Sequence, residues 1–255
     1  MSLLDALARH PTPVNLKPLA TETLLHPSTA HRILGVMVES RLVDRIEPGT
    51  YRLGVRLMEL GNLVKSRLSV RQEALPYMHA LHQALGETVN LSVRHDDEVV
   101  YIERTAPGPA MMRVVQIIGA RAPLHITAVG KIFLAQDGVD SCSDYANRTG
   151  LPRYTDNTLA DCARLTQEIE RVRDQGYAID NEEAEKGVSC IGAGIYNDEG
   201  RLVAGLSVSA PSDRLNKDWI TQIRRTAEEI SRAIGCDTGA ASASERTEGD
   251  PGSPA

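Results

Sequence analysis

Four polar side chains lie close together near the start of the sequence and could bind a negatively charged polymer. They are Ser28, Thr29, His31 and Arg32, and they follow Pro27, which suits the first turn of a helix. Hydroxyl groups at a helix start can meet a phosphate, and arginine can form paired hydrogen bonds with guanine or a phosphate. The segment therefore predicts contacts to DNA.

The same segment also has an apolar side. Ala30, Ile33, Leu34 and Met37 recur at helical spacing, so one stripe can hold the helix against its own domain while the polar residues face outward. The alternative is that the two hydroxyl residues only cap the helix and the arginine is a solvated cation. Both interpretations are compatible with these residues taken alone.

A second group, far along the chain, could bind a small anion. Thr127, Ala128 and Val129 begin a predicted helix, and small side chains there leave backbone N–H groups open to a carboxylate. Gly130 and Lys131 suggest a phosphate-binding loop, but the spacing GxxxxGK[ST] is absent. We therefore expect a carboxylate site and no nucleotide site.

Polar residues on predicted strands could complete this second site. Ser207 and Ser209 are two positions apart and share one face of a strand, and Cys190 and Asp180 lie on or before the neighbouring strand. Hydroxyl and thiol groups can donate to an oxyanion, and Asp180 can accept from a ligand hydroxyl or a water. The alternative is that the serines link strands and that the cysteine is a small core residue.

Five further polar residues are assigned no binding or catalytic role. Glu182, Glu183, Glu185 and Lys186 form a charged run that we expect to be solvated, with Glu183 bracing the loop. His125 is expected to be a structural histidine with its hydrogen bonds satisfied.

The cysteines indicate neither metal nor disulfide chemistry. The four of them form no CxxC pair, and no histidine cluster lies nearby. A catalytic Cys190 would need a base at recognisable spacing, and none is present. We expect no metal, no cofactor and no enzymatic activity.

The elements that position the first group read as three short helices followed by a hairpin, which is the winged helix-turn-helix order. Arg45 and Arg52 on the hairpin would touch the DNA backbone or the minor groove. The helices are expected at residues 3–10, 17–23 and 27–40, and the strands at 42–46 and 50–53.

The rest of the chain predicts a linker helix and an α+β domain, with an antiparallel sheet flanked by helices. The helical pattern of residues 55–85 breaks near Ser69. Strands are expected at 88–94, 98–104, 112–118, 178–180, 188–196 and 202–210, and helices at 127–136, 159–175 and 213–234. The resulting division is a DNA-binding domain at 1–54, a linker helix at 55–69, a ligand-binding domain at 70–236 and a disordered tail at 237–255.

Length and charge are compatible with this division. The 255 residues suffice for two modest domains, and the net charge of −6 is split into +1 for residues 1–55 and −7 for the remainder. A near-neutral head permits DNA binding without arguing for it. No apolar run is long enough to cross a membrane and no signal segment opens the chain, so a cytoplasmic location is expected.

Several segments resemble the IclR family of transcription regulators. They are Pro27–Leu34, Tyr51–Gly54, Arg121–Lys131, Gly176–Asn197 and Leu206–Pro211. The chain departs from the family at Leu24, where glycine is usual in the turn before the recognition helix.

The resemblance implies a winged helix-turn-helix joined to a GAF-like effector-binding domain. It implies that a small organic acid effector, for which we expect a carboxylic acid, modulates binding to double-stranded operator DNA by a homodimer or dimer of dimers. The effector contacts that the resemblance implies are Ala128, Val129, Asp180, Cys190, Ser207 and Ser209, and we expect Thr127 and Val188 to contact the effector as well. The alternatives are a small-molecule-binding protein with a degenerate DNA-binding domain and a cysteine-dependent enzyme.

Overall fold

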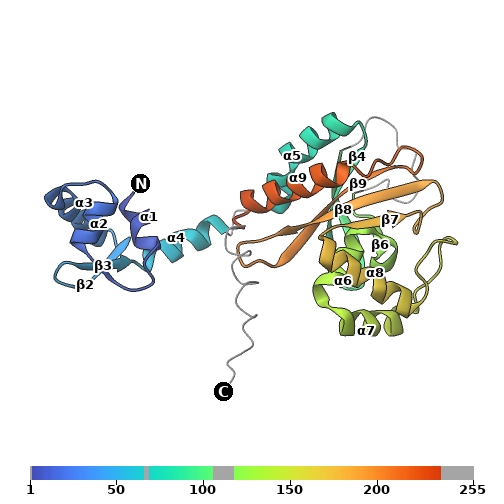
Figure 1. Ribbon diagram of the computed structural model, residues 1–255, viewed down its shortest axis with the longest axis horizontal. Helices are drawn as coiled ribbons and strands as arrows, with labels where there is room; N and C mark the ends of the chain where they lie inside the picture. The colour runs from blue at the N-terminus through green and yellow to red at the C-terminus, as the bar shows by residue number, and fades with distance from the viewer. Residues whose placement is uncertain (1, 66–68, 106–117, 237–255) are drawn as a thin grey trace, which may run out of the picture. The chain divides into compact units, whose positions relative to one another are not determined.

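The computed structural model describes residues 2–65, 69–105 and 118–236 (Figure 1). It divides into two compact units, residues 1–68 and 69–255. The expected tail at 237–255 lies outside the described residues, as does the strand expected at 112–118 except for Ile118, which lies in a turn.

The first unit packs three helices against a small sheet, as expected for a winged helix-turn-helix. Ser2 caps the first helix by accepting a hydrogen bond from the Asp5 N–H, and Leu19, Leu34 and Tyr51 are fully buried in the core. The sheet order is β1-β3-β2, and the sequence analysis missed the short strand β1. The elements are α1 (Leu3–Ala8), β1 (Val14–Asn15), α2 (Leu16–Glu22), α3 (Pro27–Glu39), β2 (Val43–Glu47) and β3 (Thr50–Leu53).

Helix α4 (Arg56–Lys65) follows the hairpin. Val55, Met58 and Leu63 are more than half exposed there. This is the linker helix that the sequence predicted, and its described part ends before Ser69, which caps the next helix.

The second unit contains a six-stranded antiparallel sheet in the order β6-β5-β4-β9-β8-β7. Strands β4 and β9 lie at its centre although more than 100 residues separate them along the chain, and Asn90 pairs with Ser207. The strands are β4 (Thr88–His95), β5 (Glu98–Thr105), β6 (Arg121–Pro123), β7 (Ala178–Asn181), β8 (Val188–Tyr196) and β9 (Leu202–Pro211).

Helices cover both faces of this sheet (Figure 1). α5 (Val70–Leu85) and α9 (Trp219–Ala233) enclose one apolar core against β4, β8 and β9. α6 (Ala128–Asp137), α7 (Val139–Thr149) and α8 (Cys162–Gln175) enclose a second core on the opposite face. The α+β architecture is confirmed, whereas α7 and β6 were not predicted, and α8 and α9 begin three and six residues later than expected. Among the described residues, no helix is both long and apolar enough to span a membrane.

Candidate functional site

Helix α3 presents the expected polar side chains to the surface. Ser28, His31 and Arg32 are exposed and Thr29 is half-buried, whereas Ala30 is buried in the core of the unit. The capping alternative for the hydroxyl residues is wrong, because His26 is the cap and its Nδ1 accepts from the Ser28 N–H. The Ser28 hydroxyl is also hydrogen-bonded to His26 Nδ1, at 2.8 Å.

The two arginines of the hairpin differ in their surroundings. Arg45 is exposed on β2. Arg52 on β3 forms an ion pair with Asp44 at 3.3 Å, although more than half of its side chain remains exposed. A phosphate would therefore have to compete with the Asp44 carboxylate for Arg52. Arg45 is the more available cation of the hairpin.

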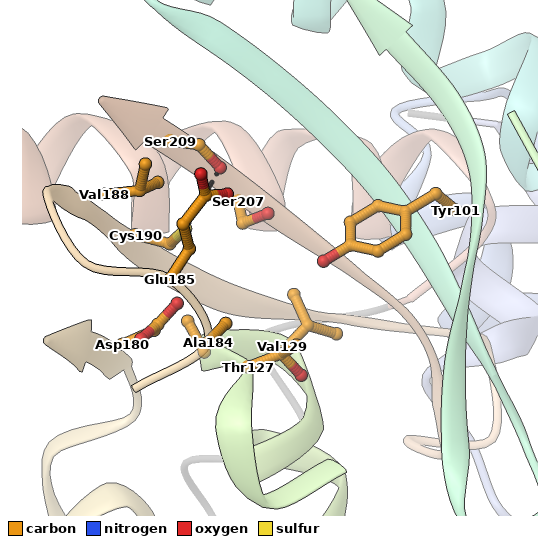
Figure 2. A pocket seen from close by; sticks show the side chains of 11 residues that line it. Tyr101, Thr127, Val129, Asp180, Ala184, Glu185, Val188, Cys190, Ser207 and Ser209 are labelled. Atoms are coloured by element: carbon orange, nitrogen blue, oxygen red, sulfur yellow. Dashed lines mark hydrogen bonds between the residues drawn. The ribbon is translucent and has the colours of Figure 1, made fainter. Parts of the chain in front are cut away.

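All eight residues expected to contact an effector line one cavity in the second unit. Figure 2 shows Ser207, Ser209 and Cys190 on adjacent strands, with Thr127 and Val129 at the start of α6 and Tyr101 across the cavity. Tyr101, Ala184 and Glu185 complete the lining. The open space is small, about 30 Å³, which is room for about two water molecules.

The start of α6 reaches the cavity because the sheet beneath it carries glycines. A Cβ on Gly205 would lie 2.2 Å from a methyl carbon of Val129, and one on Gly192 would lie 3.2 Å from the Cβ of Ala128. Thr127 caps the helix by accepting from the Gly130 N–H at 3.0 Å. The N–H groups of Ala128 and Val129, in the first turn, precede the intrahelical bonds and are the donors that an anion can take.

Strand register brings the polar residues into one row. Asp180 pairs with Cys190, and Cys190 pairs with Ser209. Sγ of Cys190 and Oγ of Ser209 share a hydrogen bond of 3.1 Å, and Ser209 Oγ also accepts from Nδ2 of Asn90 at 3.0 Å. Asn90 is fully buried and was not predicted to support the site. The row fixes the orientation of Ser209 before any ligand arrives.

Asp180 is a carboxyl group held in an unfavourable environment for its charge. It is 3% exposed, and its Oδ1 accepts from the Glu183 N–H at 2.7 Å. Burial first, and the nearby Glu183 carboxylate second, raise the pKa of Asp180 to about 7, while Lys131 opposes the shift. Near neutral pH the protonated and the ionised forms of this side chain are therefore both populated.

The thiol of Cys190 is unsuited to nucleophilic attack. Burial, together with the Asp180 carboxylate, raises the pKa of Cys190 well above that of a free thiol, so the thiolate is suppressed. The described residues lining the cavity include no histidine to act as a base. No cluster of three metal-binding side chains occurs within the described ranges.

Glu185 corrects one expectation. It was placed in a solvated charged run, yet it lines the cavity together with Ala184. Glu183 was placed in the same run and is buried rather than solvated. It braces the loop as expected, since its carbonyl accepts from Thr158 Oγ1 at 2.8 Å. His125 also matches its structural assignment, because its ring is hydrogen-bonded to Tyr145 Oη and to the Pro152 carbonyl.

The fold and the site define a class of protein, a helix-turn-helix transcription regulator whose second domain contains a small cavity lined by both polar and apolar residues. The family model for the IclR helix-turn-helix domain matches residues 1–47, and the model for the bacterial transcriptional regulator IclR C-terminal domain matches residues 63–235. The chain belongs to the IclR family.

Individual proteins of known name or structure are similar to this chain over most of its length. The DNA-binding transcriptional repressor YiaJ of Escherichia coli (strain K12) is 31% identical over 92% of this chain and 86% of its own length. The crystal structure of the Agobacterium tumefaciens repressor BlcR aligns with a TM-score of 0.83 at 29% identity, covering 91% and 93% of the two chains. An IclR homologue from Microbacterium hydrocarbonoxydans, complexed with 4-hydroxybenzoate, aligns with a TM-score of 0.61 at 26% identity, covering 91% and 95%.

Proposed function

We propose that this regulator binds operator DNA through α3 and that a small organic acid in the pocket of the second unit changes the strength of that binding. The observation that supports the proposal is the convergence of helix-start and strand residues on one cavity: Ala128, Val129, Asp180, Ser207 and Ser209. The chain acts as a repressor on the model of its named relatives, and it has no enzymatic activity of its own.

The chemistry of the pocket favours an acid that also offers a second polar group. The N–H groups of Ala128 and Val129 and the hydroxyls of Ser207 and Ser209 can donate to a carboxylate. The described lining contains no lysine or arginine, so dipoles rather than a cation would hold the anion. Asp180 on β7 and Glu185 in the turn between β7 and β8 can accept a hydrogen bond from a ligand hydroxyl, and Asp180 can do so through its carbonyl oxygen while it is protonated. 4-Hydroxybenzoate, bound by a homologue, has both groups.

The size of the cavity implies a conformational step. Its open space suits about two water molecules, so a ligand of several heavy atoms enters only if the turn carrying Ala184 and Glu185 moves. That movement is the event that a bound effector stabilises. The effector can shift operator affinity only by its differential affinity for the two arrangements, typically about 1–3 kcal/mol.

The test measures operator and effector binding separately. The DNA upstream of the regulator's own gene is titrated in gel-shift assays at several salt concentrations, with and without acids found in a thermal-shift screen. Arg32→Ala should weaken operator binding about 5- to 150-fold, the equivalent of one lost bidentate contact, and leave the thermal shift intact. Ser207→Ala should reduce the thermal shift caused by the effector and leave operator binding unchanged. Arg173→Ala, an exposed position on α8, is the control.

Two outcomes would contradict the proposal. Retention of no DNA at low salt would favour the alternative of a degenerate head, since a functional head should bind tightly when counterions are few. Unchanged operator affinity in Arg32→Ala would remove α3 from the interface.

A further inference from the structure

The exposed side of helix α3 extends well beyond the polar residues of its first turns. Ala30 and Leu34 are fully buried and define the side that packs on the core of the first unit. Helical spacing places six exposed residues on the opposite side, which we call the outer face of α3: Ser28, His31, Arg32, Gly35, Val36 and Glu39. The outer face therefore runs from the start of the helix to its last residue.

Val36 is an apolar residue in the middle of this outer face. Its side chain is 59% exposed, whereas Ile33, Met37 and Val38 of the same helix pack against the core. Ser28, Arg32 and Val36 follow one another at intervals of four residues, so they form one row along the helix. A partner that contacts Arg32 is therefore within reach of Val36.

Gly35 supplies a second, independent observation on the same face. Glycine inside a helix is destabilising relative to alanine. Nothing in the described part of the chain lies within 4 Å of the position that a Cβ on Gly35 would occupy, so packing within the protein does not require the glycine. A missing side chain on an exposed face instead leaves room for another molecule to approach the helix backbone closely.

The second half of the outer face is unsuited to phosphate groups. The side chain of Val36 forms no hydrogen bonds, and Glu39 carries a charge of the same sign as a phosphate. Base edges in the major groove present groups that both residues can meet. The 5-methyl group of thymine suits an aliphatic side chain, and the N4 amino group of cytosine can donate to a carboxylate.

We propose that α3 lies deep enough in the major groove for Val36 to contact the 5-methyl group of a thymine in each operator half-site, with Gly35 leaving room for that approach. The inference rests on the proposed function, because it takes α3 to be the DNA-binding helix. Operator DNA is the occupant of this face because Val36 continues the row that Ser28 and Arg32 begin. Val36 therefore selects a base that Arg32 does not read.

The test removes the methyl groups from the DNA. The fragment upstream of the regulator's own gene is amplified with uracil-containing primers and dUTP, so that uracil, which pairs as thymine does but has no 5-methyl group, replaces every thymine. In gel-shift titrations the wild-type full chain should bind the uracil fragment about fourfold more weakly for each half-site that loses a methyl contact.

Val36→Ala completes a double-substitution cycle with the uracil fragment. This variant should bind the thymine fragment about fourfold more weakly per half-site, and its loss on uracil replacement should be smaller than that of the wild type by the same factor. Alanine favours helix, so the substitution does not threaten α3. Ile118→Ala shortens a side chain of similar exposure in the second unit, and should respond to uracil as the wild type does.

Gly35→Ala tests the close approach separately. The added methyl group should raise the unfolding temperature of the first unit by about 2–8 °C, because alanine is the better helix former. It should weaken operator binding about fivefold or more, because the methyl group occupies space that the DNA needs. A variant that gains stability and loses binding cannot owe the loss to misfolding, and unchanged operator affinity would contradict the close approach.

Three results would overturn the thymine contact. They are wild-type binding that uracil replacement leaves unchanged, equal losses on uracil replacement in the wild type and in Val36→Ala, and a change of oligomeric mass in Val36→Ala. The last would show that another copy of the chain covers Val36. None of the three bears on the proposed function, which Arg32→Ala tests independently, whereas a wild-type chain that retains no DNA at low salt would overturn both.

Discussion

At the scale of single residues, the effector pocket depends on a carboxyl group that the protein holds near its titration point. The pKa of Asp180 is raised to about 7, mainly by burial. Between about pH 4 and pH 7 the folded protein holds a proton that the unfolded chain has lost, so this residue's contribution to stability falls as the pH rises through that window. The same proton decides how Asp180 meets a ligand, because the protonated form donates and the ionised form repels a carboxylate.

The affinity for a carboxylic acid effector should therefore depend on pH. We expect it to be nearly constant below about pH 6 and to fall up to about tenfold per unit above about pH 7, as binding becomes linked to uptake of one proton. Calorimetric titrations from pH 5.5 to 8.5 measure this slope. Asp180→Asn should abolish it, and a slope that persists in that variant would assign the proton to another group.

The sequence could identify most of this pocket but not all of it. Period-two spacing placed Ser207 and Ser209 on one strand face, the small residues at a predicted helix start indicated Thr127, Ala128 and Val129, and the family resemblance implied the same role for Ala128, Val129 and Asp180. Glu185 was missed because no periodicity describes the turn that carries it, where Glu182 and Gly187 both adopt positive φ angles. This turn brings Glu185 to the cavity, and its backbone conformation cannot be inferred from a sequence pattern.

At the scale of elements, the approach of α6 to the sheet is the contact on which the site depends. Gly205 provides the space that Val129 fills. Gly205→Ala should push the start of α6 from the sheet, destabilise the second unit by about 1–3 kcal/mol as overpacked cores do, and weaken effector binding. Chemical denaturation and the thermal shift with effector measure both effects. Gly61→Ala, with open space around it, is the control, and equal effects of the two substitutions would refute this account.

The turn between α2 and α3 stores strain at Leu24. This residue has a φ of +57° and is 93% exposed. Its side chain therefore gains no free energy from burial that would offset the cost of the left-handed backbone conformation. Leu24→Gly should stabilise the first unit by up to about 1 kcal/mol, because the left-handed region costs an ordinary residue about 1–2 kcal/mol and glycine loses part of that gain to chain entropy. Leu24→Val should destabilise it. Thermal unfolding measured by calorimetry would show the order, and a more stable valine variant would contradict it.

The elements that the sequence missed share a physical cause. β1 and β6 contain two and three residues, too few to show alternation, and they form only because a partner strand is present. α7 buries Cys142, Tyr145 and Ala146 within an otherwise polar sequence, so its apolar stripe is narrow. Long periodic segments such as α5 and β8 were predicted close to their observed limits.

At the scale of the whole molecule, we expect paired heads to read two half-sites of an operator. We expect the pairing surface to include helix α4, since Met58 and Leu63 on it and Val55 just before it are more than half exposed. Met58→Glu should weaken self-association and operator binding together, whereas Met58→Leu should preserve both. Light scattering and gel-shift assays measure the two properties, and a Met58→Glu variant with intact assembly would exclude α4 from the interface.

Strand β7 has only four residues, and its alternate positions face different spaces. A slip of this edge strand by one position would bring Asn181 to the place of Asp180, leaving an amide where the pocket now has an acid. Insertions and deletions in the hairpin between β7 and β8 should therefore be far more harmful than substitutions at the same positions. In a mutational library, variants with a changed hairpin length should lose function more often than variants with substituted side chains in the hairpin.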